Sequence, residues 1–135
     1  MKICLFSFLL FGILHSLSAQ QPKKEFEMTE GGKTYNMKQY YMVILLKGDH
    51  RNQPKEEADK IQAAHLAGIR KLADAGIIQI AGPFAHDEDP RGIFIMDVKD
   101  IDEAKRIVDQ DPAVRSGRLK YRVYPWWAAK GSTLK

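Results

Sequence analysis

The order of its hydrophobic repeats constrains the fold of this chain more than any other feature. Apolar, β-rich runs alternate with two segments whose apolar residues recur at helical spacing. The expected elements are a strand at 40–47, a helix at 56–75, strands at 77–81 and 93–98, a helix at 100–110 and a strand at 119–124. The order βαββαβ in 135 residues predicts one α+β domain, a ferredoxin-like sandwich with one antiparallel sheet and both helices on the same face.

Residues at the ends of these segments support the assignment. Pro54 suits the first turn of the long helix, and Gly76 suits the position just past its end. Asp100 and Glu103 form a capping-box pattern where the second helix begins.

A hairpin is predicted ahead of this domain, within residues 20–39. Phe26 and Met28 alternate with polar residues before Gly31-Gly32, and Tyr35 and Met37 do so after it. The alternative is a flexible leader. The domain proper then covers residues 40–128, and 129–135 form a C-terminal tail.

The first nineteen residues have the pattern of a secretory signal peptide. Lys2 precedes an apolar run at 3–14, which is too short to span a bilayer, and Ser16, Ser18 and Ala19 are small. Cleavage after Ser18 or Ala19 predicts an exported protein, periplasmic or extracellular, with no membrane span in its mature form. Cys4 lies at the start of the apolar run and not after it, so a lipid anchor is not supported.

Cysteine content and charge exclude several classes of function. Cys4 is the only cysteine, so the mature domain has no disulfide, thiol nucleophile or cysteine metal ligand. The net charge of +4 falls to +3 when Lys2 is removed. This excess is too small to indicate a nucleic-acid partner.

A second copy of the chain is the expected partner. Residues 42–46 and 93–96 are apolar on both alternating faces, as in strands that are buried on both sides. Helices cover only one face of a ferredoxin-like sheet. A two-fold homodimer of the dimeric α+β barrel type would cover the other.

The last strand carries charge on one side. Leu119, Tyr121 and Val123 alternate with Arg118, Lys120 and Arg122, which predicts a protected edge strand or, alternatively, a basic rim for an anionic substrate. The tryptophans Trp126 and Trp127 that follow are expected to seal the core or a dimer seam.

His65 is the first candidate for a functional residue. At about 100° per residue it lies near the centre of the apolar face formed by Ala58, Ile61, Ile69 and Leu72. The imidazole should therefore face the interior, where a polar group needs a partner.

Asp111 is the natural partner of His65. The following Pro112 disfavours helical geometry at Asp111, so the chain turns there, close to the inward face of the second helix. A carboxylate can orient an imidazole as general acid or base. The alternative is a structural hydrogen bond between the two helices.

Other residues give weaker signals. His86 with Asp87 and Asp89 could ligate a metal, but acidic loops between strands are usually solvated, and neither a metal nor a cofactor is expected. His50 has the setting of a surface loop. The sequence has no GxSxG elbow, Gly-rich phosphate loop or HExxH pattern, which leaves proton transfer as the favoured chemistry.

The chain resembles the YCII-related (YciI-like) family of small dimeric proteins with a ferredoxin-like fold. The resemblance rests on YYMVILLKG, AAHL, AGIIQIAGPF, RGIFIMDV, DPAVRSGRL and PWW, between about Tyr40 and Trp126. It implies that His65 and Asp111 are the pair proposed as catalytic in that family, a few members of which resemble dehydrochlorinases or muconolactone-isomerase-like enzymes. An export signal and an N-terminal hairpin are departures from the family pattern.

Two functions follow as hypotheses. The first is an exported small-molecule enzyme, an isomerase, dehydrochlorinase-like lyase or hydrolase, with a pocket between the first helix and the sheet. His65 would be its general acid or base, Asp111 would orient the ring, and Arg91 and Lys47 are possible anion contacts. The alternative is a non-catalytic dimeric module of the cell envelope that binds a small ligand.

Overall fold

The computed structural model describes residues 24–134, so the predicted signal peptide and Cys4 lie outside the described part. The described elements are β1 (Glu25–Glu30), β2 (Lys33–Lys47), α1 (Lys55–Asp74), β3 (Ile78–Pro83), β4 (Gly92–Met96), α2 (Ile101–Val108), α3 (Pro112–Arg115) and β5 (Leu119–Ala129). The expected βαββαβ order is confirmed for β2 to β5, with the short helix α3 added.

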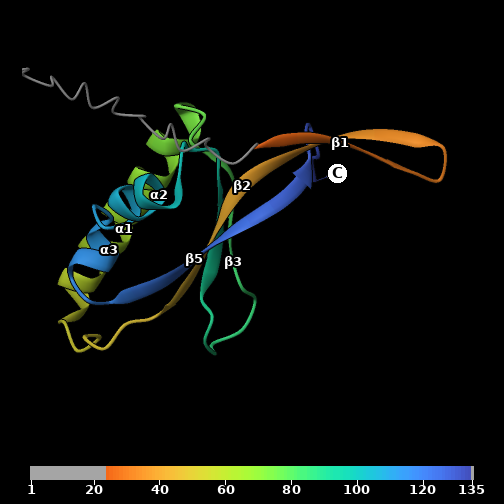
Figure 1. Cartoon of the computed structure of the whole chain (residues 1–135). Helices are drawn as coiled ribbons and strands as arrows, with labels where there is room; N and C mark the ends of the chain where they lie inside the picture. The colour runs from red at the N-terminus through yellow and green to blue at the C-terminus, as the bar shows by residue number, and fades with distance from the viewer. Residues whose placement is uncertain (1–23, 135) are drawn as a thin grey trace, which may run out of the picture.

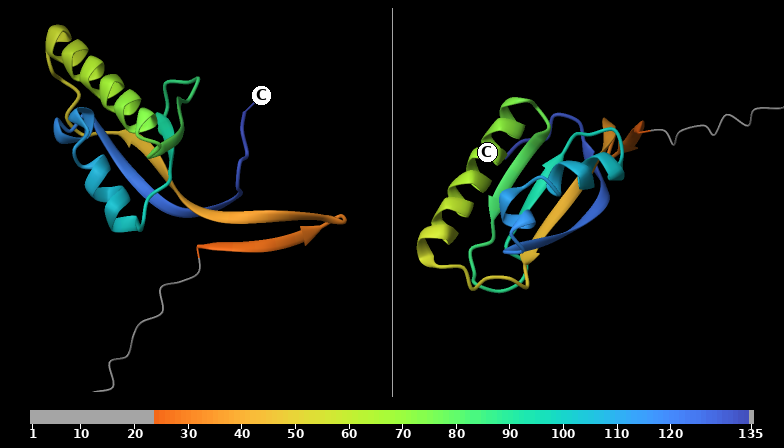
Figure 2. Two further views of the ribbon diagram at one scale, coloured as in Figure 1. Left: turned by 90° about the horizontal axis from the view of Figure 1, so that it is seen from above. Right: turned by 90° about the vertical axis from the view of Figure 1, so that its left-hand side faces the viewer.

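All neighbouring strands of the sheet are antiparallel. β2 lies between β4 and β5, and β3 pairs with the far edge of β4. Figures 1 and 2 show the three helices together on one face of this sheet. The spatial order β5-β2-β4-β3 is consistent with a ferredoxin-like fold, and the α+β class is confirmed.

The core lies between this sheet and the helices. Tyr41, Val43 and Leu45 of β2 alternate inward and are buried. They pack with buried side chains of β3, β4 and α2, namely Ile78, Phe94, Met96, Ala104 and Val108. Strands that bury every second residue explain why the period-2 pattern was readable in the sequence.

Strand β2 is longer than expected and extends beyond the core. Its first residues pair with β1 through a turn at Gly31 and Gly32, whose φ angles of 58° and 76° favour glycine. The end of β5, residues 125–129, pairs with 37–41 of β2 from the other edge and overlaps the β1 pairing at 37–38. We call this three-stranded projection, visible on the right of Figure 1, the arm: 25–39 and 125–129. The boundary drawn from the sequence between residues 39 and 40 thus falls inside one continuous strand.

The tryptophans of β5 do not seal the core within one chain. Trp126 and Trp127 are each 37% exposed, and the Trp127 ring lies in an edge-to-face arrangement with Phe26 of the arm, with ring centroids 4.9 Å apart. The expected end of the strand at residue 124 is also wrong, because β5 continues past Pro125 to Ala129 along β2.

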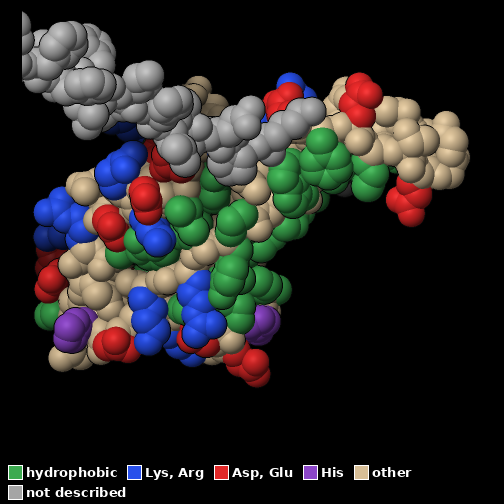
Figure 3. Space-filling view, in the orientation of Figure 1, with side chains coloured by type: hydrophobic (Ala, Val, Ile, Leu, Met, Phe, Trp, Pro, Cys, Tyr) green, Lys and Arg blue, Asp and Glu red, His purple; other side chains and the backbone are tan. Residues whose placement is uncertain are grey.

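The face of the sheet opposite the helices is apolar, and no helix of the described chain packs on it; Tyr124 and Trp126 are exposed there, whereas Ile95 is buried. Strand registry places Met42 and Ile44 of β2 on this face beside Ile93 and Ile95 of β4. Figure 3 shows hydrophobic side chains gathered from the arm down over the sheet. We call the set Tyr40, Met42, Ile44, Ile93, Ile95, Tyr124 and Trp126 the open face.

Candidate active site

His65 lies on the inward side of α1, as its sequence position predicts. It is 6% exposed and is the one buried polar or charged side chain among residues 24–134. Its ring lies over the sheet, with its centroid 6.2 Å from that of Phe94. An imidazole in such a setting needs a hydrogen-bond partner.

Asp111 supplies that partner, from a position set by α3. The second helix ends at Val108, earlier than expected, and Asp111 becomes the N-cap of α3 with Pro112 at its first position. One carboxylate oxygen, Oδ1, accepts the backbone N–H of Ala113 at 2.8 Å, so the cap fixes the carboxylate.

The other oxygen of this carboxylate faces the imidazole. Oδ2 of Asp111 lies 2.6 Å from Nδ1 of His65, and the two side chains are 11% and 8% exposed. A carboxylate at this distance favours the form of the ring that carries a proton on Nδ1. Within residues 24–134 no group hydrogen-bonds Nε2, which therefore retains its lone pair in the neutral ring.

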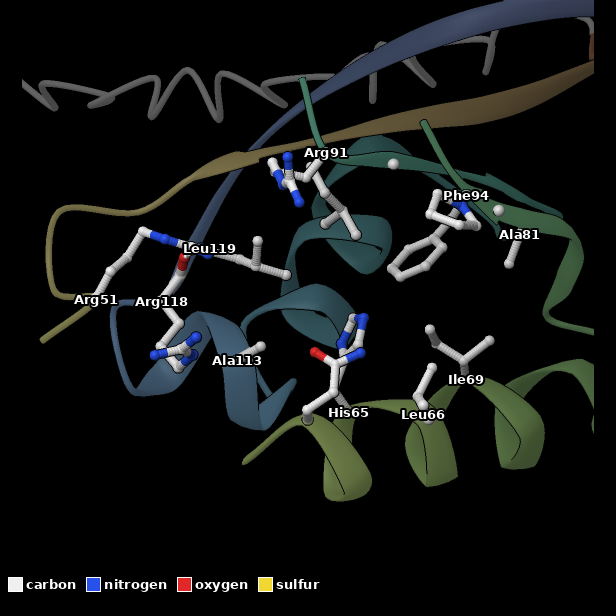
Figure 4. A pocket seen from close by; sticks show the side chains of 15 residues that line it. Arg51, His65, Leu66, Ile69, Ala81, Arg91, Phe94, Ala113, Arg118 and Leu119 are labelled. Carbon is white, nitrogen blue, oxygen red and sulfur yellow. Dashed lines mark hydrogen bonds between the residues drawn. The ribbon is translucent and has the colours of Figure 1, made fainter. Parts of the chain in front are cut away.

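A cavity of about 330 Å³ opens beside His65, between α1 and the sheet. This volume is at the lower end of the range for small-molecule sites. Its lining combines the histidine with apolar and basic side chains: Leu45, Arg51, Gln62, Leu66, Ile69, Ala81, Pro83, Arg91, Phe94, Ala113, Arg118 and Leu119 (Figure 4). The imidazole can therefore meet a small molecule bound there.

Of the two expected anion contacts, only Arg91 lines this cavity. Its guanidinium is already engaged with the carboxylate of Asp87 at 2.8 Å and with two backbone carbonyls of the same loop. Lys47 binds that loop as well, through the carbonyl of Asp87 and the carboxylate of Asp89, and does not line the cavity.

Two other arginines of the lining come from segments far apart in the sequence. Arg51 follows β2 and Arg118 precedes β5, and backbone hydrogen bonds join the two segments. The sequence placed Arg51 beside His50 in a surface loop, and it offered Arg118 as part of a protected edge or of a basic rim for an anionic substrate. The predicted fold offered one signal. Its first and last core strands are paired, and this pairing brings the residue after the first strand close to the residue before the last one.

The weaker metal candidates, His86, Asp87 and Asp89, lie in the loop between β3 and β4 and form hydrogen bonds within or next to it. Nδ1 of His86 accepts the backbone N–H of Glu88 at 3.2 Å, and Asp87 is 89% exposed on its side chain. Over residues 24–134 no cluster of three or more His, Cys, Asp or Glu side chains has a metal-binding arrangement. In the same range no helix has the length and apolar character needed to cross a bilayer.

A second cavity, of about 410 Å³, lies between α1 and α2. Its walls are mainly apolar, and Asp111 forms part of them. His65 lines the first cavity and Asp111 lines the second, so the pair lies between the two.

Fold and site define a small α+β protein with a buried His–Asp pair beside a ligand-sized cavity. The chain belongs to the YCII-related domain family, whose model matches residues 40–127. No curated protein matches it. Matching solved structures include 5-chloro-2-hydroxyhydroquinone dehydrochlorinase from Burkholderia phenoliruptrix in complex with 2,5-dihydroxybenzoquinone, at 25% identity, over 63% of this chain and 92% of that chain, with a TM-score of 0.45.

Proposed function

We propose that this protein is a small-molecule enzyme in which His65 transfers a proton through Nε2 and Asp111 holds the ring through Nδ1. The observation that supports it is the 2.6 Å contact between Nδ1 and Oδ2, made by two nearly buried side chains at the wall of a cavity. Buried charges and dipoles act strongly where water is excluded, which suits general acid–base catalysis.

The steps follow from the two ring nitrogens. Nε2 accepts a proton from a bound substrate, and the carboxylate of Asp111 stabilises the imidazolium that forms. The imidazolium then returns the proton to another atom of the substrate in an isomerisation. In an elimination it keeps the proton while a leaving group departs, and it passes the proton to water afterwards. Hydrolysis by activated water needs the same base.

Replacement of His65 by Gln tests the proposal. Isomerisation of unsaturated lactones and elimination of chloride from chlorinated hydroxyquinols are the reactions to screen, since relatives in the family resemble enzymes of these kinds. His65→Gln should lower kcat by roughly 10²–10⁴-fold, the usual size of a general acid–base contribution. The fold, followed by circular dichroism, should stay intact.

The Asp111→Ala variant provides a second, independent readout. In the native protein, nitrogen NMR shifts of neutral His65 should show the proton on Nδ1, and in the variant the proton should move to Nε2. A loss of folding in His65→Gln would mean that the pair is structural, and an unchanged tautomer in Asp111→Ala would mean that Asp111 does not hold the ring through Nδ1. Ligand binding without turnover, unaffected by either change, would favour the binding-module alternative.

We also propose that the protein is a homodimer and that it is exported. The open face supports the first proposal, because it is apolar, no helix packs on it and it exposes Tyr124 and Trp126, and monomeric proteins rarely expose large contiguous apolar patches. The charged, apolar and small-residue pattern of residues 1–19 supports the second. The mass of the protein purified from its source organism tests export, which requires an N-terminus at residue 19 or 20.

A further inference from the structure

We propose that this cavity selects substrates that carry an anionic oxygen group on a small apolar body, and that Arg51 and Arg118 bind the anion. The inference rests on the proposed function and adds the substrate class. It derives from where the two arginines lie, from the absence of opposing charge in the cavity and from the separation of polar and apolar walls.

Strand pairing holds the two arginines together. Gly48 N–H donates to the carbonyl of Arg118 at 2.9 Å, and His50 N–H donates to the carbonyl of Gly117 at 3.0 Å. An Nη1 of Arg51 adds a bond of 2.8 Å to the same Arg118 carbonyl. The loop after β2 is thus fastened to the start of β5, and both side chains line one cavity.

Both guanidinium groups keep unused donors. Nη1 of Arg118 donates to the amide oxygen of Gln53 at 2.8 Å, and Nη1 of Arg51 donates only to the backbone. A guanidinium has five N–H donors. Among the described residues neither arginine forms an ion pair, in contrast to Arg91, which is paired with Asp87. Two charges are therefore available to a ligand.

The cavity lining contains no carboxylate to neutralise them. Its charged or titratable side chains are three arginines and one histidine, while Asp111 lies behind the imidazole and binds it. An anion at this end of the cavity would meet the guanidinium groups and no carboxylate of the lining. Arginine is the side chain best suited to a carboxylate, because its planar fork can bind two oxygens at once.

The opposite part of the cavity is apolar. Figure 4 shows Arg51, Arg91 and Arg118 on one side of His65, and Leu66, Ile69, Ala81 and Phe94 on the other. A substrate with its anionic group at the arginines would lay its carbon skeleton across His65, which suits proton removal at Nε2. A purely apolar ligand would leave the guanidinium groups without a partner.

Binding of matched anionic and neutral probes tests this inference. Benzoate and trans-cinnamate are compared with benzamide and cinnamamide, which have nearly the same shape without the charge. Titrations are followed by calorimetry and by NMR shifts of His65 and Phe94. Carboxylates should bind roughly tenfold or more tightly than the amides, because a charge-assisted hydrogen bond adds about that much. Added salt should weaken only the carboxylates.

Substitution of the arginines locates the site. Arg51→Gln and Arg118→Gln should each weaken carboxylate binding roughly tenfold and leave amide binding unchanged. Arg70→Gln is the matched control, because Arg70 is exposed on α1 and does not line the cavity. Equal affinity for acids and amides would overturn the inference, as would an equal loss in Arg70→Gln or no binding of any carboxylate at millimolar concentration.

The same titrations separate this inference from the proposed function. His65→Gln should remove turnover but retain most of the preference for carboxylates over amides. If carboxylates bind at the arginines and no proton-transfer activity is found, the proposed function fails and the anion site stands. If turnover depends on His65 while neutral substrates are preferred, the anion site fails alone.

Discussion

A histidine can occupy the apolar side of α1 because one partner satisfies it from the neighbouring turn. Asp111 does so with Oδ2 while its Oδ1 caps α3, so a single carboxylate is held from two directions. An interior imidazole without a partner would cost about 1–3 kcal/mol of stability. The same geometry that prevents this loss also leaves Nε2 directed away from the carboxylate, on the side of the cavity.

Tyr121 provides a pH-dependent prediction at the residue scale. Its hydroxyl donates to Asp109 at 2.7 Å. Burial, together with the Asp109 carboxylate, raises the pKa of Tyr121 from 10.0 to about 12. The unfolded chain loses this proton near pH 10 while the native protein keeps it, so the free energy of unfolding should fall between pH 10 and about 12.

Denaturant unfolding at several pH values measures this fall. Tyr121→Phe should reduce it, by at most about 1 kcal/mol because the pair lies near the surface. Asp109→Asn should reduce it in part, since burial of the phenol remains. A profile in Tyr121→Phe identical to that of the native protein would contradict the assigned cause.

At the scale of elements, the close approach of β2 to the start of β5 shapes the cavity. A Cβ added at Gly48 would meet backbone atoms of Gly117 and Arg118, at 2.8 Å and 2.7 Å from their carbonyl carbons. Both segments meet here through their backbones, and a backbone moves aside only at a large cost in free energy. Glycine is therefore required at position 48, where β2 ends and the loop that contains Arg51 begins.

Alanine substitutions at two glycines should have opposite effects on stability. Gly48→Ala should destabilise the protein by about 1–3 kcal/mol through overpacking, and should also weaken carboxylate binding by shifting Arg51. Gly68→Ala is the control in α1, where an added Cβ meets nothing within 4 Å. It should stabilise the protein by about 0.5–1 kcal/mol, because glycine is a poor helix former.

Urea denaturation measures both effects. A Gly48→Ala protein as stable as the native one would show that the two segments can separate without cost. In that case the arginines would not be held by the strand pairing.

Element boundaries explain which sequence predictions were accurate. The capping-box pattern was right for Asp100, whose Oδ1 accepts the N–H of Glu103 at 2.8 Å, but the Glu103 carboxylate accepts from the N–H of Lys99 at 2.6 Å instead of that of Asp100. Pro54 lies at the N-cap of α1, one residue ahead of the first turn. The short α3 was missed because one helical turn has no periodicity to detect. Only its Asp-Pro start, an N-cap followed by proline, was a usable signal.

For the whole molecule, the open face is the feature that a single chain leaves unexplained. It lies opposite the helices and runs on to the arm, so a second copy could cover sheet and arm together (Figures 2 and 3). Tyr124 and Trp126, 44% and 37% exposed, would then be buried. A two-fold pairing of sheets is the arrangement that uses the same surface on both partners.

Sedimentation at micromolar concentration tests the dimer. The mature protein should sediment as a dimer, and Ile44→Lys should produce a folded monomer, because a lysine would be buried at the centre of the interface. Leu66→Lys is the matched control on the helical side, and it should remain dimeric. A monomeric native protein would remove the dimer proposal without affecting the His65–Asp111 site.

Local patterns determined the order of elements and the inward direction of His65. Both depend on spacing along one helix or strand, and burial then follows the same period. The partnership with Asp111 was also accessible, because two inward faces in one sandwich must meet. Strand ends were less accurate, since β2 is lengthened by pairing with β1 and β5, and β5 by pairing with β2.

Only the tertiary structure decided the rest of the site. Arg51 and Arg118 are 67 residues apart, and they share a cavity because the first and last core strands are neighbours in the sheet. The same packing assigned Lys47 to the loop between β3 and β4 rather than to the cavity. Contacts of this kind depend on which distant strands pair, and the spacing of residues along a chain does not show which strands these are.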